Sequence, residues 1–128
     1  MAAAKKDILI EQGATFKRVL RFKVKGSNSY EDLTGEEFRG QVRSTATDNA
    51  IVATFTCTIL DQVTNTGSVS IELTPIQTAD IPVDENENYI KRSSKYVYDI
   101  ERVFANGSID RVLEGVATVT PQVTRDEQ

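Results

Sequence analysis

Short runs of alternating apolar and polar residues, separated by turn signals, recur along nearly the whole chain. Four of the five even positions in residues 15–24 are apolar, and in residues 51–60 Phe55, Cys57 and Ile59 alternate with threonines. A period of two places successive side chains on opposite faces of a β-strand. The 13 Val, 10 Ile and 14 Thr residues, against 6 Leu, also favour strands. The sequence therefore predicts an all-β sandwich or barrel.

Two local signals place a helix and a hairpin within this series of strands. Thr74-Pro-Ile-Gln77 has the spacing of a capping box with proline at the first helical position, which predicts a short helical turn over about 75–80. Asn106-Gly107 is the preferred pair for a two-residue hairpin turn. That turn would pair Phe104 with Ile109, Ile100 with Leu113, Tyr98 with Gly115 and Tyr96 with Ala117, all on one buried face.

The opposite face of this hairpin would carry four carboxylates, namely Asp99, Glu101, Asp110 and Glu114. In this register Asp99 lies opposite Glu114, while Arg102 and Arg111 fall on the other face and compensate poorly. Like charges that face each other cost stability unless a cation intervenes. Three interpretations stay open: a partner contact or cation site, a solvated surface, and a glycosidase-like acid pair.

The composition excludes most catalytic and metal sites. The chain has no histidine, so histidine-dependent triads and most zinc sites cannot form, and its single Cys57 allows no internal disulfide. Cys57 is predicted on an apolar strand face. The acids Asp80, Asp84, Glu85 and Glu87 lack the alternating ligand pattern and central glycine of a calcium loop. We therefore expect no catalytic residue, metal or cofactor, and no small-molecule ligand.

The charge is distributed unevenly along the 128 residues. The net charge of −4 arises from +3 in residues 1–47, −7 in residues 48–90 and zero in residues 91–128. Such an acidic chain lacks the clustered cations of a nucleic-acid binder. A basic face of one copy could meet an acidic face of a neighbour, although a solvated mixed surface has the same pattern. The possible partner contacts are Lys5, Lys6, Lys17, Arg21, Lys23, Asp84, Glu85, Glu87 and Arg125.

The predicted organisation is a flexible N-terminal arm over 1–6, one domain over 7–121 and a C-terminal tail over 122–128. One compact domain is the natural size for a chain of this length. The longest apolar runs are too short to span a membrane, and the positively charged N-terminus is not followed by the apolar stretch of a secretory signal.

Several motifs, taken in order, resemble small virion proteins of tailed bacteriophages, and the resemblance spans about residues 8–125. It implies an immunoglobulin-like antiparallel β-sandwich of about seven to eight strands. The motifs that carry it are Ile10-Glu-Gln-Gly-Ala-Thr-Phe16, Asp32-Leu-Thr-Gly35, Phe38-Arg-Gly-Gln-Val-Arg43, Gly67-Ser-Val-Ser-Ile-Glu-Leu-Thr74, Gln77-Thr78-Ala79, Tyr96-Val-Tyr-Asp-Ile100, Asn106-Gly107, Leu113-Glu-Gly-Val116 and Pro121-Gln-Val-Thr-Arg125.

The resemblance implies a structural role in the virion and no enzymatic activity. We expect an assembly or adaptor module of the tail, baseplate, collar or fibre-attachment region, which forms a symmetric homo-oligomer and contacts other virion proteins. The alternative is a β-sandwich that binds carbohydrate or a host surface. This alternative needs exposed aromatic rings, for which Tyr30, Tyr89 and the 84–92 loop are the candidates.

Overall fold

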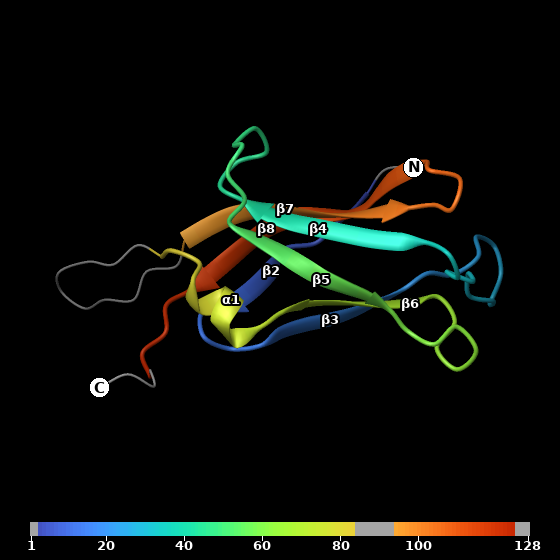
Figure 1. Cartoon of the computed structure of the whole chain (residues 1–128), viewed down its shortest axis with the longest axis horizontal. Helices are drawn as coiled ribbons and strands as arrows, with labels where there is room; N and C mark the ends of the chain where they lie inside the picture. Colours follow the sequence, from blue (N-terminus) through green and yellow to red (C-terminus); the bar gives the residue numbers. More distant parts are fainter. Residues whose placement is uncertain (1–2, 84–93, 125–128) are drawn as a thin grey trace.

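The computed structural model describes residues 3–83 and 94–124, and this part of the chain forms strands and one short helix (Figure 1). The expected all-β class is confirmed. No helix in this part is long and apolar enough to cross a membrane. The elements are β1 (Ala4–Lys5), β2 (Ile8–Glu11), β3 (Phe16–Arg21), β4 (Glu37–Arg43), β5 (Ala53–Ile59), β6 (Ser68–Leu73), α1 (Pro75–Ala79), β7 (Ser94–Val103) and β8 (Ile109–Thr120).

The strands form one sheet that curls into two facing layers, in the order β1-β8-β7-β4-β5-β6-β3. The corner is β5, which pairs with β4 through Ala53–Phe55 and with β6 through Thr56–Ile59. The order β8-β7-β4-β5 follows the G-F-C-C′ strands of an immunoglobulin variable domain, and the pair β3-β6 follows its B and E strands. The fold is therefore an immunoglobulin-like β-sandwich, as the family resemblance implied.

One edge of the sheet differs from the antiparallel arrangement that was predicted. Both β1 and β2 run parallel to β8, whereas the other strand pairs are antiparallel. Ala4 and Lys5, which were assigned to a flexible arm, form β1 and so belong to the sheet. At the other terminus, the amide of Gln122 donates to the side-chain carbonyl of Gln12 at 3.0 Å, so the tail begins docked against the β2–β3 turn.

The core lies between the two layers and is bridged by aromatic rings. The ring of Phe55 on β5 is 5.9 Å from that of Phe16 on β3 and 6.1 Å from that of Tyr98 on β7. Phe16 and Phe55 are buried on the strand faces that the alternation predicted. Cys57 is half-buried against this core, and burial raises the pKa of its thiol to about 11.

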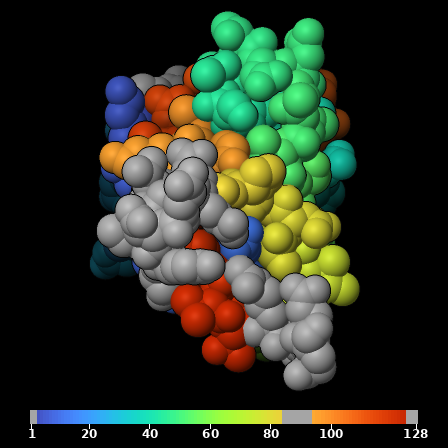
Figure 2. Space-filling model, turned by 90° about the vertical axis from the view of Figure 1, so that its left-hand side faces the viewer, coloured from blue at the N-terminus to red at the C-terminus, as the bar shows by residue number. Residues whose placement is uncertain are grey.

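The helix α1 closes one end of the molecule, which Figure 2 views directly. Both hydrogen bonds of the predicted capping box are present between Thr74 and Gln77. The buried hydroxyl of Thr78 donates to the carbonyl of Ala14 at 2.9 Å and accepts from the amide of Gly13 at 3.0 Å. These bonds join α1 to the turn between β2 and β3.

The β7–β8 hairpin follows the predicted register only in the part that is distant from its loop. Tyr96, Tyr98 and Ile100 pair with Ala117, Gly115 and Leu113, as expected. Beyond Ile100 the register shifts by one residue, so Val103 rather than Phe104 pairs with Ile109, which is 46% exposed. The amide of Phe104 donates to the carbonyl of Ser108 at 2.8 Å, and the amide of Gly107 donates to the carbonyl of Phe104 at 2.9 Å, so the loop has three residues instead of two. Gly107 adopts a φ of +91°, as a three-residue hairpin loop requires.

This shift leaves Val112 as an extra residue in β8, a β-bulge, and it changes which charges share a face. Arg111 now pairs with Glu101 on the outer face, and Asp110 pairs with Arg102. The prediction that Arg111 lies on the other face from the carboxylates is therefore wrong, as is the prediction that Asp110 shares a face with Asp99. The physical cause is the bulge, because one inserted residue moves the following side chains to the other face.

Candidate functional site: a charged groove on the outer face of the sheet

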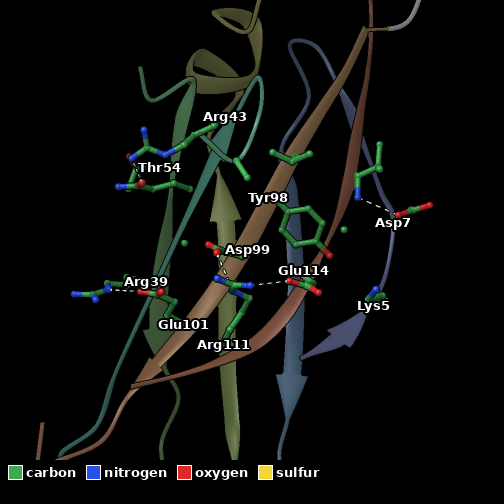
Figure 3. A pocket seen from close by; sticks show the side chains of 16 residues that line it. Lys5, Asp7, Arg39, Arg43, Thr54, Tyr98, Asp99, Glu101, Arg111 and Glu114 are labelled. Carbon is green, nitrogen blue, oxygen red and sulfur yellow. Dashed lines mark hydrogen bonds and ion pairs between the residues drawn. The ribbon is translucent and has the colours of Figure 1, made fainter. Parts of the chain in front are cut away.

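An open groove of about 810 Å³ crosses the outer face of β4, β7 and β8 and is bordered by β1 (Figure 3). Its wall contains Gln41, Thr54, Val97 and Val116 beside the charged groups. The ionisable side chains that line it, apart from Tyr98, are four cations and four carboxylates: Lys5, Arg39, Arg43, Arg111, Asp7, Asp99, Glu101 and Glu114. The groove therefore has no net formal charge.

Strand register explains why these side chains gather there. Alternate residues of β4 and β7 point outward, and Arg39 pairs with Glu101 while Gln41 pairs with Asp99. On the other side of β7, Asp99 pairs with Glu114, as the sequence predicted. Lys5 of β1 is the register partner of Glu114 across the parallel edge. The charges consequently form rows that run across the strands.

The carboxylates are compensated by arginines. The Nε of Arg111 is 3.3 Å from Oδ2 of Asp99, and its Nη1 is 3.1 Å from Oε1 of Glu114. The Nε of Arg39 is 2.8 Å from Oε1 of Glu101. Figure 3 shows Arg111 extending between Asp99 and Glu114. The like-charge pair that the sequence predicted is thus present, with the guanidinium that it needs.

The pKa of the Asp99 carboxyl group is raised above its usual value. Burial raises it most, and the neighbouring carboxylate of Glu101 raises it further, against the lowering effect of Arg111. A raised pKa is one property of a general acid. Arg111, however, contacts both Asp99 and Glu114 in a groove that is open to solvent. A glycosidase acid also needs a second carboxylate placed across a substrate cleft, so this arrangement is better suited to polar contact with a surface.

Of the predicted partner contacts that fall within the described residues, only Lys5 lines the groove. Lys6 is exposed beside it, and its backbone amide donates to the carbonyl of Glu114 at 2.9 Å. Lys17, Arg21 and Lys23 are exposed on β3 and just beyond it, in the other layer. The remaining predicted contacts, Asp84, Glu85, Glu87 and Arg125, lie outside the described residues.

The sequence interpretation missed the roles of Arg39, Arg43 and Asp7. Arg39 and Arg43 lie on one face of β4, as strand alternation requires, but only the pairing of β4 with β7 brings them to the carboxylates. Arg43 donates to the carbonyl of Asp48 at 2.8 Å and to the side chain of Gln41 at 2.7 Å. Strand alternation indicates which face of β4 the two arginines occupy. No pattern in the sequence indicates that β7 is the strand that pairs with β4.

Tyr30, the aromatic candidate for sugar binding that lies within the described residues, does not line this groove. The guanidinium of Arg21 lies 3.5 Å from the centre of the Tyr30 ring and covers one face of it. Tyr89 lies outside the described residues. Among those described, no group of three or more histidine, cysteine or acidic side chains is arranged to hold a metal ion.

No protein-family model matches the chain, and no curated protein matches it. Among solved structures, one of murine CRIg superposes with a TM-score of 0.40 and 10% sequence identity, covering 91% of this chain and 92% of that chain. A likeness at this level carries no argument about function.

Proposed function

We propose that the protein is a non-enzymatic structural component of a tailed-phage virion, an assembly or adaptor module of the tail, baseplate, collar or fibre-attachment region. The observation that carries the proposal is the order of the phage-like motifs along residues 8–125. The role would be exercised in the assembled particle, through contacts with other virion proteins and further copies of the chain.

The charged groove supports this proposal as a contact surface. Its arginines lie on hydrogen-bonded strands, so their positions are fixed before a partner arrives. Arginine is enriched in protein interfaces, and alternating charges favour one docking register over others. Because Arg39 and Arg111 are both more than half exposed, they remain available to a partner while paired within the chain.

The direct test is the protein content of purified particles and the effect of removing the chain. Mass spectrometry should detect the chain in particles, and a nonsense mutation in its gene should stop assembly or leave particles without a substructure. Particles that lack the chain and assemble normally without it would overturn the proposal.

A pair of variants tests the groove itself. K5Q/R39Q removes two cations from the groove and should lower incorporation of the chain into particles. R18Q/K25Q removes two cations from exposed positions outside the groove and should leave incorporation unchanged. Equal incorporation of the two variants would exclude the groove as the contact surface while leaving the virion role open.

A further inference from the structure

The outer edge of β8 binds an extended segment, namely the chain's own residues 4–11. Ala4 and Lys5 pair with Leu113 and Glu114, and the four residues of β2 pair with 117–120. The amides of Lys6 and Gln12 extend this ladder at 2.9 and 3.0 Å. Backbone hydrogen bonds along a sheet edge are the basis of peptide binding by strand addition.

The β8 edge has specific features at its centre, where the segment crosses Gly115. A Cβ atom at Gly115 would lie 2.2 Å from the carbonyl oxygen of Lys6, so only glycine permits this approach. The Tyr98 hydroxyl donates to the same carbonyl, and the amide of Val116 donates to the Asp7 carboxylate at 3.0 Å. Figure 3 shows Tyr98, Lys5 and Asp7 together on this side of the charged groove. The edge therefore recognises a carboxylate and the peptide carbonyl just before it.

Two apolar anchors follow this carboxylate. Ile8 is 7% exposed and Ile10 is completely buried, whereas Leu9 between them is 49% exposed. Alternate side chains that enter the core give an added strand its sequence preference. The site is consequently shaped for the sequence Asp-Ile-x-Ile, which this chain itself carries at residues 7–10.

Along the chain, residues 4–11 connect to the other described elements only through the β2–β3 turn. Its strands have β8 as their one hydrogen-bonded neighbour in the described sheet. The turn is held in place independently, because Gly13 and Ala14 bond the Thr78 side chain and Gln12 donates to the carbonyl of Ile81 at 2.9 Å. The bonds that hold the turn therefore do not depend on the pairing of residues 4–11 with β8.

We infer that residues 4–11 exchange between neighbouring copies, so that β1 and β2 of one chain occupy the β8 edge of another. The occupant is a second copy because the site matches this chain's own sequence, and exchange of an identical element preserves each contact. This inference rests on the assembly role proposed above and names the partner. Within one chain, the tethered segment reaches its own β8 edge with an effective concentration on the order of 1 mM. The segment of a neighbouring copy must compete with it, which is favoured when a particle holds the copies side by side.

Two single-cysteine chains test the exchange, each with Cys57→Ala to remove the native thiol. One carries L9C and the other T118C, which are register partners across β2 and β8. They are unfolded together in urea, refolded together and oxidised with glutathione disulfide. At about 1 mM, exchange should give a disulfide-linked heterodimer, and its share should fall roughly tenfold or more at about 10 μM. Peptide mapping locates the linkage.

The matched control replaces the L9C chain with one that carries K95C, the β7 partner of residue 118. Because β7 and β8 belong to one hairpin, this mixture should give no specific heterodimer. A single chain with both L9C and T118C should close its disulfide at about 10 μM, which shows that the geometry permits the bond. A heterodimer yield no higher than that of the K95C mixture at the high concentration would overturn the exchange. That failure would leave the virion role standing if particles still require the chain.

Discussion

Arg102 is a buried cation on the core face of β7, and replacing it with methionine should destabilise the fold strongly. Its side chain is 7% exposed, and its guanidinium carbon lies 4.5 Å from the centre of the Phe104 ring and 5.2 Å from that of Phe22. Its Nε is 2.5 Å from the carboxylate of Glu36, and its Nη2 is 3.0 Å from that of Glu31. Burial alone would lower the pKa of Arg102, but these carboxylates raise it above its usual value.

The magnitude follows from the exposure of the two carboxylates. Glu36 is 12% exposed, so R102M leaves a nearly buried charge without its partner, which costs about 3–5 kcal/mol for a fully buried pair. Glu31 is 35% exposed and regains water, so its share is about 0–1 kcal/mol. Methionine retains part of the contact with the two rings. We therefore expect R102M to lower the free energy of unfolding by about 3 kcal/mol.

Urea unfolding followed by circular dichroism measures this loss, since the chain has no tryptophan. The control is R39M, the same change in a pair whose side chains are 57% and 31% exposed, which should cost less than about 1 kcal/mol. The double variant E36L/R102M should recover most of the loss, because it replaces both charges with apolar groups. Equal losses for R102M and R39M would refute the reasoning, as would a double variant no more stable than R102M.

Three further substitutions probe the edge, the turn and the groove. Gly115→Ala should release β1, because its Cβ would lie 2.2 Å from the carbonyl oxygen of Lys6, and amide exchange should become faster at Lys6 but not within β7. Gly107→Val should lower the free energy of unfolding by about 1–2 kcal/mol, because Gly107 has a φ of +91°, and an unchanged urea midpoint would contradict this loop. Asp99→Asn should stabilise the fold at neutral pH but not in acid. Burial and Glu101 raise the pKa of Asp99 in the folded state, so the stability present below its unfolded-state pKa is lost as pH rises through the folded-state value. Urea melts at pH 3 and pH 7 that give the same difference would contradict this.

Local sequence patterns predicted most of the fold because their physical causes are local. The alternation in residues 51–60 predicted the buried face of Phe55, and the Thr74 capping box predicted α1. The parallel edge had no comparable signal. It depends on Gly115, about a hundred residues away along the chain, allowing the backbone of Lys6 to approach. Close approach between distant segments cannot be read from residue spacing alone.

The charged groove was half predictable for a related reason. Strand alternation placed Asp99, Glu101 and Glu114 on one face, and that placement is confirmed. Arg111 was assigned to the wrong face because a regular hairpin allows no other position for it. The buried Arg102 was placed on the correct face but given no role, since its carboxylate partners lie in a loop and at a turn before β4.

The β-bulge at Val112 links the length of the hairpin loop to the charge pattern of the groove. In the part of the hairpin that is distant from the loop, Tyr98 pairs with Gly115, and the missing side chain of this glycine leaves space for the backbone of Lys6. A three-residue loop, however, requires the pairs next to it to be shifted by one residue, so that Val103 pairs with Ile109. The bulge at Val112 absorbs this difference, and the same insertion turns Arg111 toward Asp99 and Glu114. Without it, the two carboxylates would face each other without a guanidinium between them, at a cost in stability. The docking of the N-terminal strand and the compensation of the groove are thus both satisfied by a single irregularity in β8.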